Sequence, residues 1–187
     1  MGSAHLEAET TGALFKSFFR KLIQVFAMTR LPVGSRFRCT LERWRGVKVG
    51  KHVFLGGGNV LDRARPDLIT IEDYVSLAGN VNILTHSNPT EPIREILGEA
   101  ATKIAPVHIK RGAWIAVSVV ILPGVTIGEN SIVAAGSVVL QQTIIEPNSI
   151  YAGVPAKRIK AIDPKQSKEM IKGIAENYLF YASWYKE

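Results

Sequence analysis

An internal repeat of six residues runs through the second half of the chain and limits its fold more than any other feature. Between Val107 and Asn148 an aliphatic residue returns at every sixth position, and a smaller or β-branched residue stands two positions before each one. The aliphatic series is Ile109, Ile115, Ile121, Ile127, Val133, Val139 and Ile145, and the earlier series is Val107, Ala113, Val119, Val125, Ser131, Ser137 and Thr143. A period of six matches neither a helix of 3.6 residues per turn nor an alternating strand. It is typical of a short strand followed by a corner, repeated as in a parallel β-helix.

The repeat predicts the environment of each position. We expect every aliphatic residue to point inward from a flat side, with the smaller residue packed beside it. Gly124 and residues 128–130 fall at corners, where a positive φ is often needed. Three sides close one coil, and stacked coils bury a continuous core and satisfy the backbone groups between them. No single coil is therefore expected to be stable alone.

The same phase continues upstream with two interruptions. Val49, Leu55 and Leu61 form one set, and Ile71, Leu77 and Ile83 form another. The chain leaves the repeat near residues 63–67 and again, for longer, near residues 85–106. A loop as long as the second one is usually functional or disordered. We therefore expect a β-helix domain at 47–162, with a tail, helix and linker at 1–46 and a C-terminal helix at 163–187.

The segments on either side of the repeat predict helices and a linker. Residues 11–28 place apolar side chains at helical spacing, with Lys16, Arg20 and Lys21 on the other side. This helix is expected either to cap the β-helix or pack on a neighbouring subunit, or to lie on the inner membrane surface. Residues 31–46 are expected to be a linker with a solvated basic surface, which carries Arg36, Arg38, Arg43 and Arg45.

The composition limits the partners and the setting of the chain. With 187 residues and 47% hydrophobic content, it suits one domain with helical appendages. A net charge of +7 predicts anionic partners, such as the phosphates of a cofactor, nucleic acid or a membrane surface. We expect no nucleic-acid binding, because the basic residues follow no recognised motif. The single cysteine, Cys39, excludes an internal disulfide, and with no signal-peptide pattern or spanning apolar run it predicts a cytoplasmic protein.

Two stretches carry a resemblance to a known family. The segment WIAVSVVILPGVTIGENSIVAAGSVV and the later YAGVPAKRIK resemble the galactoside, maltose and polysaccharide O-acetyltransferases, which are hexapeptide-repeat acyltransferases. The resemblance covers residues 47–160. It implies a left-handed parallel β-helix, which is an exception to the right-handed crossover rule. It also implies acetyl-CoA as co-substrate, no metal, a homotrimer with sites between subunits, and a hydroxyl of a sugar or surface-polysaccharide precursor as acceptor.

Among the four histidines, His86 is the candidate for catalysis. It follows Thr85, where the phase breaks and the long excursion begins, and the resemblance implies a general base at such a place. A neutral imidazole can take the proton of a hydroxyl near pH 7. No covalent enzyme intermediate is required, so we expect direct attack in a ternary complex. A carboxylate or carbonyl should fix the tautomer of His86. The alternative is that His86 is a surface-loop histidine without a catalytic role.

The resemblance also implies sites for coenzyme A. Small residues near the corners are expected to make a groove for the pantetheine arm, and basic residues near the last coil are expected to meet the phosphates. The candidates for contact with the co-substrate are Trp114, Ala116, Ala134, Ala135, Lys157, Arg158 and Lys160. Packing alone is another explanation for Trp114. The basic residues near the last coil could equally be a solvent-exposed segment where the chain leaves the β-helix. The chain departs from the family at Leu140 to Gln142, where Thr-Lys is common.

The candidates for binding the acceptor are polar residues one coil before the histidine: Asn59, Asp62 and Asn80. The run Gly56 to Asn59 suggests that the backbone closely approaches another group, although Asn and Gly also form ordinary turns. Three other functions stay open. These are N-acetylation of an amino sugar, a γ-type carbonic anhydrase with three histidines around zinc, and a β-helix scaffold without catalysis.

Overall fold

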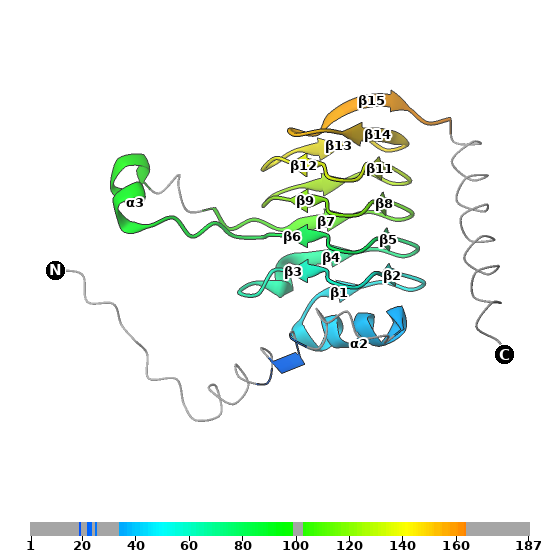
Figure 1. Ribbon diagram of the computed structural model, residues 1–187, viewed down its shortest axis with the longest axis horizontal. Coiled ribbons are helices and arrows are strands. Elements are labelled where there is room, and N and C mark those ends of the chain that lie inside the picture. The colour runs from blue at the N-terminus through cyan, green and yellow to red at the C-terminus, as the bar shows by residue number, and fades with distance from the viewer. Residues whose placement is uncertain (1–18, 20–21, 24, 26–33, 99–102, 164–187) are drawn as a thin grey trace.

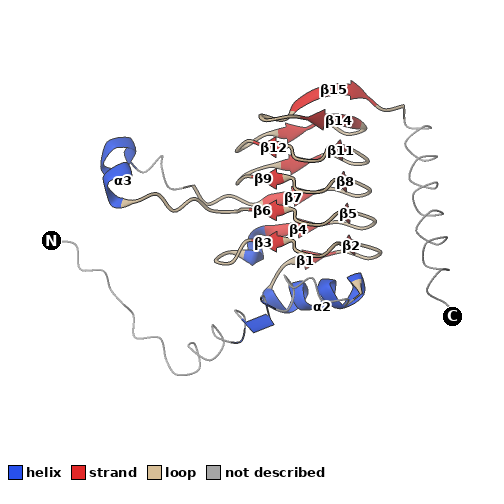
Figure 2. Ribbon diagram, viewed as in Figure 1, coloured by secondary structure: helices blue, strands red, loops and turns tan. Residues whose placement is uncertain are grey.

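The computed structural model describes residues 19, 22–23, 25, 34–98 and 103–163, and Figure 1 shows that their strands form a stack of coils. Helix α2 (Ser35–Arg45) lies at the end where the stack begins, and β15 (Lys157–Ala161) lies at the other end. A long arm that carries helix α3 (Glu91–Leu97) projects sideways from the stack. In the described residues the helices lie outside the stack and the strands form its sides (Figure 2).

Each coil contributes one short strand to each of three sides. The first coil has β1 (Lys48–Val49), β2 (Phe54–Leu55) and β3 (Val60–Leu61), and the second has β4 (Ile69–Ile71), β5 (Ser76–Leu77) and β6 (Asn82–Ile83). The third has β7 (Val107–Ile109), β8 (Trp114–Ile115) and β9 (Val120–Ile121), and the fourth has β10 (Thr126–Ile127), β11 (Ile132–Val133) and β12 (Val138–Val139). The fifth coil has β13 (Ile144–Ile145) and β14 (Ser149–Ala152).

The strands stack into three sheets. Sheet A has the order β1-β4-β7-β10-β13, sheet B the order β15-β14-β11-β8-β5-β2, and sheet C the order β12-β9-β6-β3. All pairs are parallel except β14 with β15, which is antiparallel. The register keeps the repeat aligned, so that Leu55 pairs with Leu77 and Leu77 with Ile115. The chain therefore turns at an A/B, a B/C and a C/A corner in each complete coil.

The core confirms the six-residue ladder. The residues from Ile109 to Ile145 in the aliphatic series are each 0% exposed, and the series two positions earlier is buried from Val107 through Ser137. Gly124 takes a φ of 81° at its corner, as expected. Gly128 is needed for a different reason, because a Cβ there would lie 2.5 Å from the backbone nitrogen of Pro147. Small residues at these corners allow the coils to stack closely.

The segment expected to be a solvated linker is instead a helix. Residues 35–45 form α2, which ends at Gly46 with a φ of 110°. Its residues Cys39, Leu41, Glu42 and Arg45 are buried. Four further positions nearer the N-terminus, at 19, 22, 23 and 25, are helical, and Ile23 is buried against Leu41. The rest of the expected helix at 11–28, and the expected C-terminal helix after Asp163, lie outside the described residues.

Both interruptions of the repeat leave the stack at the C/A corner. The first contains a short 3₁₀ helix at Pro66–Leu68. The second forms the arm, whose two ends are joined near the stack by a bond from Ser87 N to Lys103 O (2.9 Å) and one from Ala105 N to Thr85 O (2.9 Å). Within the described part of the chain, no helix combines the length and apolar character needed to cross a membrane.

Candidate active site

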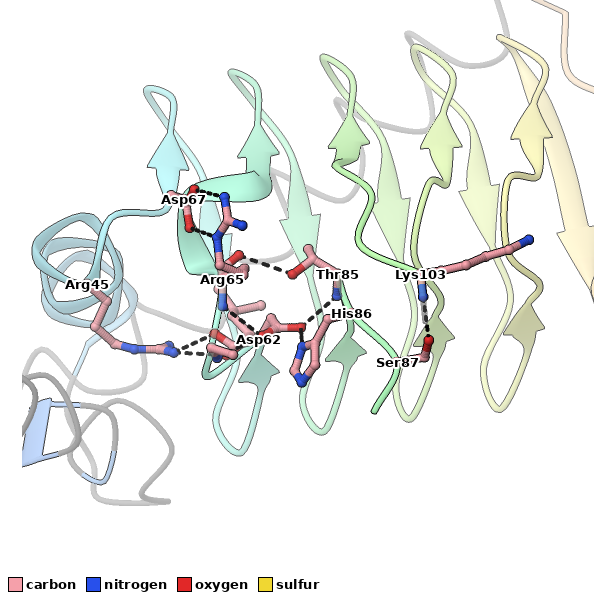
Figure 3. Close-up of polar contacts among 10 residues, drawn as sticks. Arg45, Asp62, Arg65, Asp67, Thr85, His86, Ser87 and Lys103 are labelled. Carbon is pink, nitrogen blue, oxygen red and sulfur yellow. Dashed lines mark hydrogen bonds and ion pairs between the residues drawn. The ribbon is translucent and has the colours of Figure 1, made fainter. Parts of the chain in front are cut away.

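His86 lies where the long arm leaves the stack. The preceding Leu84 still donates its N–H to Ile121 O of the next coil (2.9 Å), and Thr85 is fully buried. His86 is thus the first residue whose side chain is free of the core, and 31% of that side chain is exposed. Figure 3 shows its ring directed toward Asp62 at the end of β3. The last ordered turn of the coil therefore fixes the backbone of the histidine.

Asp62 holds the histidine through a short hydrogen bond. Its Oδ2 lies 2.6 Å from His86 Nδ1 and also accepts the N–H of Thr85 at 2.7 Å. Its Oδ1 accepts the N–H groups of Ala64 (2.8 Å) and Arg65 (3.0 Å). The Asp62 side chain is 0% exposed. Each carboxylate oxygen is therefore occupied by two donors, and Asp62 is directed at His86 and the backbone.

These donors keep Asp62 ionised. Burial raises the pKa of the carboxyl, but the N–H groups of Thr85 and Arg65 and the ring of His86 lower it further, and the resulting pKa is about 2. An ionised carboxylate only accepts hydrogen bonds, so His86 Nδ1 carries a proton in this pair. The second nitrogen, Nε2, is then unprotonated in the neutral ring. This arrangement can take a proton from a bound hydroxyl or amine.

The first interruption of the repeat is built around Asp62. Its side chain accepts the N–H groups two and three residues later, which is the pattern that forms an Asx turn. Thr85 Oγ1 donates to Arg65 O at 3.1 Å and ties this turn to the second coil. At the surface, Arg65 pairs with Asp67 through two bonds of 3.0 and 2.8 Å. The turn at residues 62–65 therefore places the carboxylate beside the second coil.

The structure separates the three acceptor candidates. Asn59 is 5% exposed, and its amide accepts the N–H of Val81 (2.9 Å) and donates to Gly56 O (3.2 Å). Asn80 occupies a left-handed corner position with a φ of 59°. Both asparagines belong to the B/C corner, whereas Asp62 belongs to the C/A corner with the histidine. The close backbone approach expected at Gly56 is to the next coil, because a Cβ there would lie 2.6 Å from the carbonyl carbon of Ala78.

The candidates for contact with coenzyme A lie in three places. Ala116 and Ala134 follow β8 and β11 at the B/C corner of successive coils and are half-buried, and Ala135 is exposed beside them. Trp114 stands on sheet B between Ser76 and Ile132, its partners in the neighbouring strands. The basic candidates Lys157, Arg158 and Lys160 are exposed on β15, where Arg158 Nε lies 3.2 Å from Glu146 Oε2.

The other two described histidines lie apart from His86. His52 stacks on Tyr74 at 4.9 Å, and His108 Nε2 lies 2.7 Å from Glu72 Oε1. Across the ranges that the structure describes, no three His, Cys, Asp or Glu side chains form a group that could hold a metal ion. A surface hollow of about 450 Å³ lies over sheet A and is lined in part by Glu72 and Arg111.

Comparisons with known proteins agree with this architecture. The family model described as "Bacterial transferase hexapeptide (six repeats)" matches residues 106–141. Galactoside O-acetyltransferase of Escherichia coli K12 is 38% identical over 97 residues, which are 52% of this chain and 46% of that protein. A Staphylococcus aureus Mu50 protein, itself named only as an inferred acetyltransferase, is 36% identical over 75% of this chain and 67% of its own length. The chain spans about half the length of the first curated relatives that it matches.

A solved structure matches more of the chain. The hexapeptide-repeat acetyltransferase of Vibrio cholerae, complexed with acetyl-CoA, is 25% identical with a TM-score of 0.64, and the match covers 85% of this chain and 93% of that one. The fold is the left-handed parallel β-helix expected from the sequence. Together the repeat model, the Staphylococcus relative and this fold show that the chain belongs to the hexapeptide-repeat transferase family.

Proposed function

We propose that this protein is an acetyl-CoA-dependent O-acetyltransferase acting on a hydroxyl of a sugar or surface-polysaccharide precursor. The observation that carries the proposal is the bond between buried Asp62 and half-exposed His86 at the exit of the long arm. The named activity of the similar Escherichia coli protein, a galactoside O-acetyltransferase, and the acetyl-CoA bound by the similar Vibrio protein support the reaction class.

The proposed chemistry needs one proton carrier. Acetyl-CoA, when bound, supplies the acetyl group as a reactive thioester. His86 Nε2 takes the proton of the acceptor hydroxyl as its oxygen forms a bond to the acetyl carbon. The same nitrogen then returns the proton to the sulfur as the carbon–sulfur bond breaks. Asp62 keeps the ring in the Nδ1–H tautomer and stabilises the imidazolium that forms between these steps. No enzyme side chain is acylated.

We further propose that the working unit is a homotrimer with its sites between chains. His86 lies at the C/A corner, while Ala116 and Ala134 lie at the B/C corner, with sheet C between them. A six-residue step across that sheet is at most roughly 20 Å. In a ring of three chains, the C/A corner of one chain can face the B/C corner of the next. The exposed Ile96 and Leu97 of α3, at 76% and 59%, offer the arm an apolar surface for a neighbouring chain.

We propose a cytoplasmic enzyme whose residues 11–28 pack against the capping end of the stack or on a neighbouring chain, or contact the inner membrane face. Of this segment the structure describes only four positions. Phe19, Leu22 and Val25 are exposed, whereas Ile23 faces α2. Exposed apolar side chains in a protein with a net charge of +7 are suited to contact with an anionic lipid surface. Flotation with anionic vesicles should carry the intact chain to the top of the gradient, and a chain that stays at the bottom contradicts the contact.

The function is tested by acetyl transfer to a panel of sugars. We expect release of free thiol from acetyl-CoA to depend on a hydroxyl acceptor, and we expect the product to be an ester that mild base cleaves. A product stable to mild base, formed only with amino sugars, would indicate N-acetylation instead. The His86→Ala variant should lose about a hundredfold or more in kcat, as general bases do. Turnover near the wild-type rate in that variant would remove the proposal.

A further inference from the structure

Helix α2 closes the end of the β-helix with arginine side chains. In the first coil, the carbonyl groups that point away from the second coil have no preceding coil whose N–H groups could bind them. Three of these groups stand six residues apart, one on each side of the stack, and each accepts a hydrogen bond from α2. The pairs are Arg43 Nε with Val49 O (3.0 Å), Arg38 Nη1 with Leu55 O (3.4 Å) and Arg45 Nη2 with Leu61 O (3.0 Å). Three of the four arginines expected to be solvated thus bond to backbone acceptors of the first coil. Arg36 and Arg43 are exposed as expected, whereas Arg38 is half-buried and Arg45 is buried.

Arg45 differs from the other two because it reaches the site. Its Nη2 also donates to the backbone oxygen of Asp62 at 2.7 Å, and its Nη1 donates to Glu42 Oε2 at 2.6 Å. Both side chains of this pair are about as buried as the core, at 2% and 3% exposure. Burial raises the pKa of Glu42 to about 7, against the opposing effect of Arg45. The guanidinium is therefore fixed by α2 on one side and by the end of β3 on the other.

Asp62 is consequently held from two directions. Arg45 binds its backbone oxygen, while Thr85 N and His86 Nδ1 bind its carboxylate from the second coil. Figure 3 shows Arg45 directed from α2 at the main chain beside Asp62, with His86 on the far side of the same residue. A shift of this backbone would carry the carboxylate with it and change the bond that orients the ring.

We propose that Arg45 is a positioning residue for acetyl transfer, which fixes the backbone of Asp62 and through it the tautomer and direction of His86. The proposal rests on the function proposed above for this site. It extends the support of the catalytic pair to a helix that precedes the β-helix. A planar guanidinium suits this task because two N–H groups can be directed at neighbouring carbonyls in a fixed geometry.

The chain provides a matched control on another side of the stack. Arg43 binds Val49 O and also Gly50 O, at 3.0 and 2.6 Å, just as Arg45 binds the carbonyls of residues 61 and 62. Residues 49 and 50 belong to sheet A and its corner, where no residue of the proposed catalytic pair lies. The two arginines thus share the capping contacts, but only Arg45 binds the backbone of Asp62. Arg45 is also buried and paired with Glu42, whereas Arg43 is exposed, so the tautomer of His86 is needed as a readout besides kcat.

The experiment compares Arg45→Lys with Arg43→Lys. Lysine keeps the charge beside Glu42 but loses the fork that binds two carbonyls. In Arg45→Lys we expect kcat to fall by about tenfold to a hundredfold, as for a small misplacement of a catalytic group. The KM for acetyl-CoA should stay within about twofold, because a positioning defect weakens the chemical step rather than ground-state binding. Arg43→Lys should keep wild-type kcat. Equal kcat values in the two variants would overturn the proposal.

A second readout does not depend on acetyl transfer. Nitrogen-15 NMR of the imidazole, assigned with His86→Ala, should show His86 as the Nδ1–H tautomer in the wild type and in Arg43→Lys, and as a mixture in Arg45→Lys. An unchanged tautomer in Arg45→Lys contradicts the proposal. If the wild type transfers no acetyl group, the proposed function fails while this measurement still decides the role of Arg45. If Arg45→Lys does not fold, Glu42→Met removes the acceptor of the Arg45 Nη1 bond and should shift the tautomer in the same direction. A wild-type spectrum in that variant overturns the proposal.

Discussion

The carboxylate of Asp62 accepts four hydrogen bonds within a fully buried setting, and this single residue organises the candidate site. The sequence indicates His86, because the phase is lost after Thr85 and the resemblance to the O-acetyltransferases implies a general base at such a place. It does not indicate the partner. The two residues are 24 positions apart, and their contact depends on how two irregular loops fold. Because the contact cannot be seen in the sequence, Asp62 is predicted there to bind the acceptor. The geometry instead favours a role for Asp62 in orienting the ring of His86.

Replacing Asp62 with asparagine tests this orientation. In Asp62→Asn, an NH₂ group must face donors that the carboxylate now satisfies, so His86 loses its fixed tautomer. We expect kcat to fall by about a hundredfold to ten-thousandfold, the upper value being that of a comparable change in a catalytic triad. Steady-state kinetics should be compared with Asp67→Asn, which breaks an exposed pair with Arg65 and should leave kcat unchanged. Activity of Asp62→Asn within about threefold of wild type would contradict the pairing.

The pKa of Asp62 also predicts an acid dependence of stability. A folded pKa of about 2 lies below the usual 3.9, so the carboxylate stabilises the fold above about pH 4 and loses this contribution as the pH falls toward 2. The shift corresponds to about 2–3 kcal/mol. The difference in unfolding free energy between wild type and Asp62→Asn, measured by denaturant titration, should therefore shrink across this window. A difference that does not change with pH would refute the assignment.

At the scale of elements, the strands are predictable and the closing helix is not. Every coil repeats the same inward position, so each residue of the ladder from Ile109 to Ile145 independently indicates the same fold. Helix α2 occurs once and replaces a missing coil. Its arginines donate hydrogen bonds to backbone carbonyls of the first coil. The spacing of charged residues in the sequence does not predict these bonds. The turn around Asp62 is equally hard to predict, because the sequence shows it only as an interruption of the six-residue repeat.

Neighbouring isoleucines of β13 provide a test of the ladder. Ile145 is 0% exposed and Ile144 is 71% exposed, although both belong to one two-residue strand. Ile145→Ala should lower the free energy of unfolding by about 2–5 kcal/mol, as for other buried isoleucines. Ile144→Ala should change it by less than about 0.5 kcal/mol. Chemical denaturation of both variants measures the contrast, and equal losses would mean that the inward and outward positions are wrongly assigned.

At the scale of the whole molecule, the stack places its proposed parts on different edges. The base lies at the C/A corner of the second coil, the small residues lie at the B/C corner of the third and fourth coils, and the basic strand β15 lies at the far end. In the proposed trimer, each chain would therefore contribute the base to one site and the small residues to another. The sequence cannot show this arrangement from its own pattern, because the period of six describes a coil and not the packing of one stack against another.

The measurement that tests the account most directly mixes two inactive variants. His86→Ala lacks the base, and Ala134→Trp fills the proposed donor groove, so each variant alone should be inactive. When equal amounts are unfolded and refolded together, random assembly of a ring of three pairs a sound base with a sound groove at about one quarter of the interfaces. We predict recovery of about one quarter of wild-type activity. No recovery, with light scattering showing three chains per particle, would contradict a site shared between chains with His86 as its base.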